Sequence, residues 1–305
     1  MTSPLIQLNL PENFHIEGIL AYHQRDKQQL AERIHDQNSD TPGIDKGIIW
    51  QGKPALIAIR FPKHNPTSKI SQATAELLVD GPSKTTEAEL SLLTERMLGL
   101  HQDVALFEQK YRDHPLLGSL IANNSGLRIP TVASPFEAFS WAIIGQQISV
   151  TAAISIRSRL IQTAAVLHST SMHCYPDAEH INALGYQQLR NCGLSDSKAN
   201  CLLNLSSHVI SEGYFSQNWL KALGAENVRQ TLLDLKGIGP WTINYGLLRG
   251  FGWLDESLET DAAVRRNLTQ LLQLEDKISP SRTAEWLEQF RPFRSLVAAH
   301  LWEMG

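Results

Sequence analysis

The sequence is poor in basic charge, in cysteine and in long apolar runs, and each shortage excludes a class of protein. Its 27 lysine and arginine residues are outnumbered by 31 acidic residues, so the formal net charge is −4. A broad cationic face for nucleic acid is therefore excluded, and any contact with a polyanion must be local, through backbone amides and a few cations. The three cysteines lack paired spacing and fit reduced thiols, rather than a disulfide framework or a zinc site.

The chain also lacks the signals that direct a protein to a membrane or to export. It contains no run of about 18 apolar residues, the length needed to span a bilayer. The first residues, Met1–Leu8, contain neither a basic segment nor a continuous apolar segment. We therefore expect a cytoplasmic protein with no membrane partner, and a length of 305 residues allows it more than one domain.

Two kinds of pattern divide the chain near residue 104. Residues 1–104 mix strand and helix patterns: β-rich runs at Gly47–Gln51 and Pro54–Phe61 meet at a hairpin signal, and Thr86–Leu100 has the spacing of an amphipathic helix. Residues 105–305 carry almost only helical patterns. We expect a mainly α protein, in which a small α/β N-terminal domain precedes a helical body of two subdomains.

Two local signals refine this expectation. Ser134, Pro135 and Glu137 stand in the order of an N-cap, a first helical proline and an N3 glutamate, which predicts a capping box. Lys63–Ser68 contains proline, asparagine and serine and is predicted to be a loop.

Residues 228–250 have the pattern of two helices joined by a glycine turn. The first helix is predicted to end near Lys236, because one of its faces carries the apolar residues Val228, Leu232 and Leu235. Gly237 and Gly239 permit unusual backbone angles and leave their amides uncovered. Pro240 then sets the first turn of the next helix, whose free N–H groups and positive dipole end can bind a phosphate.

One carboxylate follows this turn at a helix start. Thr260 is predicted to be the N-cap and Asp261 the first helical residue, because an apolar stripe continues behind them at Val264, Leu268 and Leu271. The helix dipole favours the ionised form of a carboxylate at such a position. An aspartate there is usually only a helix cap, so a chemical role depends on its relation to the glycine turn.

Several ordered motifs accompany these two features: His114–Leu117, Gly126–Pro130, Phe136–Phe139, Ile144–Val150, Leu235–Tyr245, Thr260–Asp261, Arg291–Ser295 and His300–Trp302. As a set they resemble the AlkA-type 3-methyladenine DNA glycosylases of the helix-hairpin-helix superfamily. The resemblance covers about residues 110–305, and for residues 1–104 it implies a domain similar to the TATA-binding protein.

The resemblance implies a role for each site residue. Asp261 would be the catalytic aspartate, which stabilises positive charge on the sugar and orients the attacking water. An aromatic pocket for flipped alkylated purines such as 3-methyladenine would be formed by Trp241, Tyr245 and Trp302, since electron-rich rings attract cationic bases. Gln147 would be the wedge that fills the gap left by the base, and the DNA backbone would contact Lys236, Gly237, Gly239 and Thr242.

The resemblance also bears on cofactors and partners. The bifunctional relatives place a nucleophilic lysine where this chain has Trp241, so we expect hydrolysis by water without a covalent intermediate. Three cysteines cannot form an iron–sulfur loop, and none of the 11 histidines has metal-ligand spacing, His300 being interpreted as a packed residue. We expect no cofactor apart from a monovalent cation at the hairpin carbonyls, and a monomer that acts at the nucleoid on double-stranded DNA containing alkylated bases.

Two alternatives remain open from the sequence. One is a helix-hairpin-helix protein that binds damaged DNA without catalysis, and the other is a glycosylase for oxidised bases. Trp141 and Trp253 are interpreted as packing residues.

Overall fold

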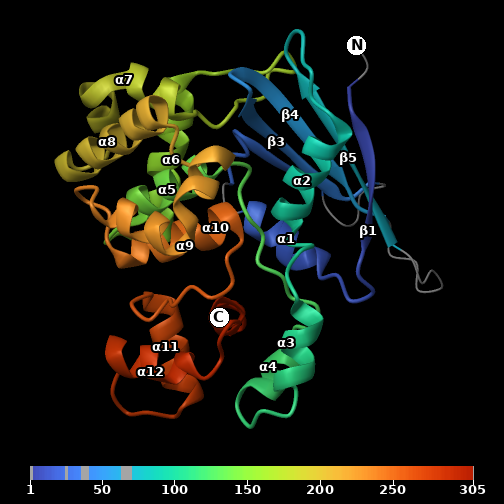
Figure 1. Cartoon of the computed structure of the whole chain (residues 1–305), viewed down its shortest axis with the longest axis vertical. Coiled ribbons are helices and arrows are strands. Elements are labelled where there is room, and N and C mark those ends of the chain that lie inside the picture. The colour runs from blue at the N-terminus through green and yellow to red at the C-terminus, as the bar shows by residue number, and fades with distance from the viewer. Residues whose placement is uncertain (1–2, 25–26, 36–40, 63–70, 305) are drawn as a thin grey trace.

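The computed structural model describes residues 3–24, 27–35, 41–62 and 71–304 (Figure 1). The loop predicted at Lys63–Ser68 lies outside the described residues. In the described part of the chain, no helix has the length and apolar character needed to cross a bilayer.

The strands form a single antiparallel sheet with the order β1-β5-β4-β3-β2. The strands are β1 (Leu5–Leu10), β2 (Glu32–His35), β3 (Gly43–Trp50), β4 (Lys53–Arg60) and β5 (Ser71–Val79). The predicted hairpin is confirmed: β3 and β4 are joined by Gln51 and Gly52, whose φ angles of 49° and 75° match the twist of a two-residue turn. The sequence patterns did not identify β2 or β5.

Two helices, α1 (Ile16–His23) and α2 (Glu87–Leu98), pack against the sheet and share its core. Figure 1 shows α1 between the sheet and the rest of the molecule. The predicted helix at Thr86–Leu100 is confirmed as α2, which Thr86 caps through a complete capping box with Glu89. The expected α/β N-terminal domain is therefore present.

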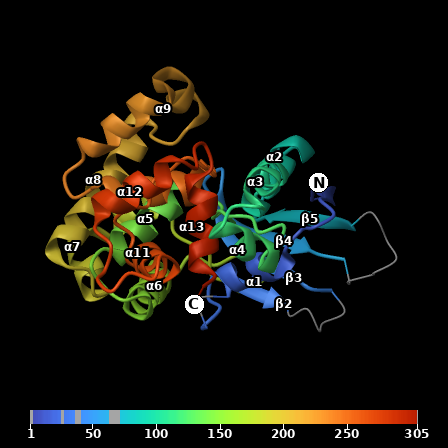
Figure 2. The same cartoon turned by 90° about the horizontal axis from the view of Figure 1, so that it is seen from below.

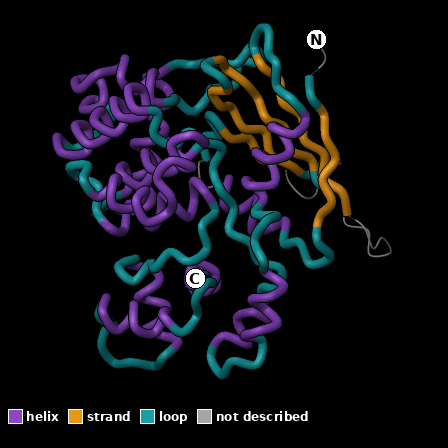
Figure 3. The backbone as a smooth tube through the Cα atoms, viewed as in Figure 1, coloured by secondary structure: helices purple, strands orange, loops and turns teal. Residues whose placement is uncertain are grey.

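The remainder of the chain is helical, as predicted (Figure 3). Its helices are α3 (Val104–Tyr111), α4 (Leu117–Asn123), α5 (Pro135–Gly145), α6 (Val150–Ala164), α7 (Ala178–Asn191), α8 (Asp196–Glu212), α9 (Gln217–Leu233), α10 (Pro240–Phe251), α11 (Ala262–Leu271), α12 (Pro280–Glu288) and α13 (Arg294–Trp302). One apolar core lies among α5 to α10, and a second joins α3 and α4 to α11, α12 and α13. In Figure 2, α7, α8 and α9 lie on the opposite side of the molecule from β5. The domain boundary at residue 104 stays a prediction.

The capping box predicted at the start of α5 is wrong in one half. The Ser134 side chain accepts a hydrogen bond from the Glu137 backbone N–H at 3.2 Å, as an N-cap does. The Glu137 carboxylate, however, does not return to the cap, because the buried Nζ of Lys46 on β3 binds it at 2.7 Å. A tertiary ion pair has therefore replaced the local hydrogen bond.

This ion pair belongs to a buried cluster that joins the sheet to the helical body. Lys46 and Glu32 from the sheet meet Glu137 of α5 and Arg157 of α6, and all four side chains are less than 10% exposed. Burial alone would raise the pKa of Glu32, but Lys46 and Arg157 hold that pKa well below its usual range. The cluster fixes the position of the N-terminal domain against the helices.

Candidate active site

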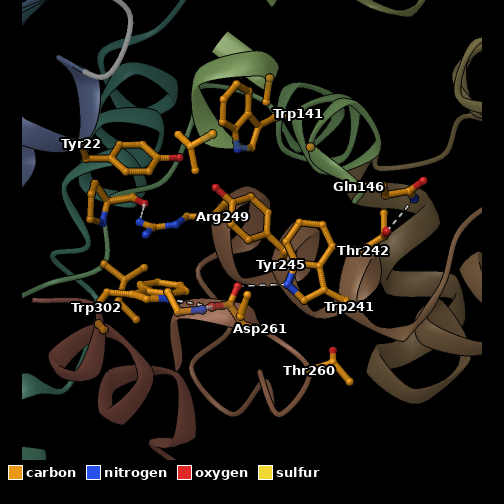
Figure 4. A pocket seen from close by; sticks show the side chains of 18 of the residues that line it. Tyr22, Trp141, Gln146, Trp241, Thr242, Tyr245, Arg249, Thr260, Asp261 and Trp302 are labelled. Carbon is orange, nitrogen blue, oxygen red and sulfur yellow. Dashed lines mark hydrogen bonds between the residues drawn. The ribbon is translucent and has the colours of Figure 1, made fainter. Parts of the chain in front are cut away.

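A cleft of about 1270 Å³ lies where the N-terminal domain, the hairpin and the last helices meet. Its lining includes residues of α1, of the turn between α5 and α6, of the hairpin before α10, of the start of α11, and of α13. Figure 4 shows Asp261, Trp241, Tyr245 and Trp302 gathered in this cleft. The structure therefore brings together the residues that the sequence predicted for catalysis and base binding.

The Asp261 carboxylate lies at the N-terminus of α11, but not in the predicted position. Asp261 itself is the N-cap, with φ −63° and ψ 129°, and its Oδ1 accepts the backbone N–H groups of Ala263 and Val264 at 3.0 Å each. The prediction of Thr260 as the cap is wrong, since Thr260 is exposed and precedes the cap. Aspartate caps a helix at least as well as threonine does, and its short side chain reaches both amides.

Two tryptophans donate hydrogen bonds to the same carboxylate. The indole N–H of Trp302 donates to Oδ1 and that of Trp241 to Oδ2, both at 3.2 Å (Figure 4). Oδ1 therefore accepts three hydrogen bonds and Oδ2 one within the described part of the chain. Oδ2 keeps a free lone pair for a water molecule, whereas Oδ1 fixes the orientation of the group.

The predicted pairing of Trp241 with Tyr245 is present. The two rings stack with centroids 5.4 Å apart and an interplanar angle of 29°, as the four-residue spacing on one helix face allows. Tyr245 is buried and Trp241 is partly exposed, so Tyr245 supports one face of Trp241 within the cleft.

The hairpin has the geometry of an anion-binding turn. Gly237 has a φ of 94°, and Gly239 is the N-cap of α10 with no side-chain hydrogen bond to the first amides of the helix. An added Cβ at Gly239 would meet no atom within 4 Å, so the approach to these amides is open. The start of α10 is thus available to a phosphate oxygen.

The remaining predicted DNA contacts lie at different depths. Lys236 is exposed beside the hairpin, outside the residues that line the cleft. Thr242 is buried, and its Oγ1 accepts a hydrogen bond from Gln146 Nε2 at 3.0 Å, while the same Nε2 donates to the Gly237 carbonyl at 2.9 Å. Thr242 therefore joins the hairpin to the turn after α5, and Gln146, which was not predicted as a site residue, is the link.

Gln147 occupies the tip of that turn, where a wedge is predicted. Its φ is 55°, its side chain is exposed, and it lines the mouth of the cleft. Two exposed apolar residues, Ile148 and Val150, follow directly. The tip of the turn thus presents a polar side chain next to apolar surface.

Hydrogen bonds and an ion pair fix the position of the segment between α10 and Asp261. Arg229 of α9 pairs with Glu256 and with Asn244, and Asn244 in turn binds the carbonyl of Ser257. Burial raises the pKa of Glu256, although the Arg229 guanidinium acts in the opposite direction. These contacts hold the backbone that carries Asp261 against α9 and α10.

The lining of the cleft also includes residues that the sequence did not identify as part of a site. Tyr22 reaches the cleft from α1, Trp141 from α5 and Arg249 from α10 (Figure 4). Arg249 follows Trp241 and Tyr245 at helical spacing, and Trp141 stands one helical turn before Gly145, so both positions carried a signal. Trp141 packs against the core of α5 to α10, as interpreted, and also lines the cleft. No local pattern could have indicated Tyr22.

The side chains and carbonyl groups near the cleft can be compared with what a metal ion or a monovalent cation would need. Within the described residues, no group of three or more histidine, cysteine or acidic side chains could hold a metal ion. The implied monovalent cation would need hairpin carbonyls, and those of Leu235 and Gly237 each accept one hydrogen bond and retain a second lone pair. Two hairpin carbonyls thus keep acceptor capacity, and binding of a cation there stays a prediction.

Residues 140–292 match the HhH-GPD superfamily of base excision DNA repair proteins, and the chain belongs to this superfamily. A DNA-3-methyladenine glycosylase of Bacillus subtilis (strain 168) is 22% identical over 305 residues, which cover 98% of this chain and 97% of that protein. DNA-3-methyladenine glycosylase 2 of Escherichia coli (strain K12) is 28% identical over 192 residues. The matched region covers 61% of this chain and 63% of that relative, which is less than two thirds of its length.

Solved structures show the same fold. The 3-methyladenine DNA glycosylase from Archaeoglobus fulgidus superposes with a TM-score of 0.77 at 22% identity, covering 97% of each chain. The 8-oxoguanine glycosylase/lyase of Clostridium acetobutylicum, solved with double-stranded DNA, superposes with a TM-score of 0.70 at 14% identity, covering 98% of this chain and 97% of that chain. The predicted fold class and family resemblance are confirmed.

Proposed function

We propose that this base excision repair protein is a monofunctional DNA glycosylase that flips alkylated purines, 3-methyladenine among them, out of duplex DNA and hydrolyses their N-glycosidic bond. The observation that carries the proposal is the Asp261 carboxylate, which lies in the cleft between two tryptophan N–H donors and has one oxygen largely free. The names of the Bacillus subtilis and Escherichia coli relatives support the same substrate class.

The proposed reaction uses Asp261 twice. As the bond between the sugar C1′ and the base nitrogen breaks, its electron pair leaves with the base and positive charge develops on the sugar. A carboxylate beside C1′ stabilises that charge. Water then adds to C1′ and gives its proton to Oδ2 of Asp261, the oxygen with a free lone pair, which leaves an abasic site.

The aromatic lining suits a base that already carries positive charge. An N3- or N7-alkylated purine is cationic, so it leaves as a neutral molecule and needs little protonation. The face of Trp241 that Tyr245 does not cover attracts such a base by about 1–2 kcal/mol when it is desolvated, and Trp302 lines the same cleft. The carboxylate of Asp261 adds an attraction of the same sign.

Two features beside the cleft are proposed to bind the DNA: the N-terminus of α10 and the side chain of Gln147. The open amides at the start of α10 bind a backbone phosphate without a lysine cluster, which accounts for DNA binding by a chain with a net charge of −4. Gln147, exposed at the mouth of the cleft, fills the space left by the flipped base and hydrogen-bonds its former partner.

Hydrolysis is favoured over lyase chemistry because the cleft offers no amine nucleophile. Trp241 contributes an indole, which cannot form a Schiff base, and no lysine is among the described residues that line the cleft. The enzyme is therefore expected to leave the abasic strand uncut.

Incubation of the protein with methylated duplex DNA, followed by chromatography of the released bases, tests the function. We expect free 3-methyladenine and no protein–DNA adduct after borohydride reduction. Release of 8-oxoguanine with a trapped adduct would instead favour the oxidised-base glycosylase, and DNA binding without any base release would favour the non-catalytic binder.

A further inference from the structure

One buried cation in the cleft has no acidic partner. Arg249 on α10 is 8% exposed and lines the cleft, yet within the described part of the chain no carboxylate pairs with it. Burying an unpaired charge is costly unless other groups satisfy it. Here the compensation is aromatic: the guanidinium carbon lies 4.3 Å from the ring centroid of Tyr22 and 5.1 Å from that of Trp302 (Figure 4).

The hydrogen-bonding capacity of Arg249 is also largely unused. Its Nη1 donates to the Pro130 carbonyl at 2.8 Å, and its buried Nε has no partner within the described residues. A guanidinium carries five N–H donors and no acceptor, so the terminal N–H groups that do not bind Pro130 remain for a ligand. The complementary ligand group is an oxygen acceptor that enters the cleft beside Trp302.

We propose, on the basis of the proposed glycosylase function, that Arg249 determines specificity by donating hydrogen bonds to a carbonyl oxygen of the flipped base. The bases that fit are 6-oxopurines, which present O6 as an acceptor beside N7, whereas adenine derivatives keep N7 but present an N6 amino group that donates in place of O6. Arg249 thereby lets the cleft accept a neutral 6-oxopurine such as hypoxanthine.

The chemistry of a neutral base gives the arginine a second effect. When the bond from C1′ to N9 breaks, the electron pair leaves with an uncharged base, which becomes an anion with negative charge spread to O6. A guanidinium at O6 stabilises that anion, which takes its proton from solvent after release. The water that adds to C1′ gives its proton to Asp261, as for the alkylated bases.

A cationic 3-methyladenine gains nothing from the same group. It leaves as a neutral molecule, its N6 amino group meets another donor, and its positive charge lies near the guanidinium. Arg249 therefore shifts the preference of the cleft from cationic adenine derivatives towards neutral 6-oxopurines.

Tyr22 gives the N-terminal domain a part in this selection. Its ring lies on the side of the guanidinium away from Trp302, so Arg249 is held between a residue of α1 and a residue of α13. Tyr22 is in this sense a positioning residue, which acts on the base through Arg249.

The test compares single-turnover release of hypoxanthine from a hypoxanthine-containing duplex with release of 3-methyladenine from methylated DNA. In Arg249→Met, the ratio of the hypoxanthine rate to the 3-methyladenine rate is expected to fall about 10- to 100-fold, the value of a hydrogen bond to a charged group. Arg249→Gln, which keeps donors without charge, is expected to give an intermediate ratio.

The matched control is Arg96→Met. Arg96 is also buried, but it donates to three backbone carbonyls outside the cleft. This variant is expected to change both rates in parallel.

The outcomes separate this inference from the proposed function. If the wild type releases neither base, the glycosylase proposal itself fails. If it releases 3-methyladenine but no hypoxanthine, or if both Arg249 variants keep the wild-type ratio, the role of Arg249 is overturned. A weaker affinity of the variants for every duplex with no change in ratio would assign Arg249 to a phosphate and would also overturn it.

Discussion

Asp261 caps a helix with the same side chain to which we assign the proposed chemistry. Oδ1 caps α11 and accepts the Trp302 indole, while Oδ2 accepts only the Trp241 indole. Because a helix cap and two indoles restrain the rotation of the carboxylate, it would meet the sugar of the proposed substrate already oriented. The resemblance to the AlkA-type glycosylases indicated Asp261, but the sequence could not show that both tryptophans point their N–H groups at it.

Replacing either indole should therefore slow the chemical step. Trp241→Phe and Trp302→Phe keep an aromatic wall but remove one hydrogen bond to the carboxylate, and we expect each to lower the single-turnover rate about 10-fold. Trp286→Phe, outside the residues that line the cleft, is the control. Rates for both cleft variants within twofold of the wild type would show that the indole hydrogen bonds do not support catalysis.

Arg249 shows where a single sequence stops being informative at this scale. Its spacing from Trp241 places it on the same helix face, but an arginine on a helix is usually solvated. Only the tertiary contacts with Tyr22, Trp302 and Pro130 show that it is buried in the cleft.

At the scale of the element, the hairpin between α9 and α10 was predictable because its determinants are local. Gly237, Gly239 and Pro240 specify a turn and a helix start whatever surrounds them, and the structure has both. Strands β2 and β5 escaped prediction because their pairing in the sheet depends on residues distant in sequence. The half-formed capping box of α5 has the same cause, since Lys46 competes for Glu137.

The two hairpin glycines should respond differently to alanine. At Gly237, with a φ of 94°, a Cβ would also lie 3.0 Å from Cβ and Sγ of Cys201, so we expect Gly237→Ala to cost about 1–3 kcal/mol of stability and to weaken duplex binding. Gly239→Ala adds its Cβ to open space and should lose less stability. Thermal unfolding and fluorescence anisotropy measure both effects, and equal losses for the two variants would contradict this account of the turn.

At the scale of the molecule, the cleft depends on the packing of the sheet domain against the helices. The cluster of Lys46, Glu32, Glu137 and Arg157 joins the two parts, and Tyr22 reaches the cleft only because α1 is held there. Neither contact is encoded by a local pattern. The sequence therefore predicted the class of each region, but not that the N-terminal domain forms part of the cleft.

A buried histidine makes the stability of this assembly sensitive to acid. His300 of α13 was interpreted as a packed residue, and it is fully buried against Phe107. Burial lowers its pKa from 6.5 to about 4, so the unfolded chain takes up a proton first as the pH falls. The folded state therefore loses stability below about pH 6.5, by about 2 kcal/mol between pH 7.5 and pH 5.

His300→Phe removes the titrating group but keeps a ring beside Phe107. Urea unfolding at the two pH values should show that about 2 kcal/mol of the acid-induced loss disappears in this variant. His101→Asn, at an exposed position, should keep the full loss. Equal acid sensitivity of wild type and His300→Phe would show that other groups determine it.

The Asp261 carboxylate is proposed to drive cleavage of the glycosidic bond, and a paired measurement on Asp261→Asn examines this role. Asparagine keeps a side-chain oxygen for the amides of α11 but loses the negative charge that stabilises the sugar and the base that accepts a proton from water. We predict that single-turnover release of 3-methyladenine falls at least about 100-fold, as expected for the loss of a principal electrostatic group, while the affinity for a duplex with an abasic-site analogue changes little. Base release by Asp261→Asn at the wild-type rate, with the protein folded and bound to DNA, would contradict the account.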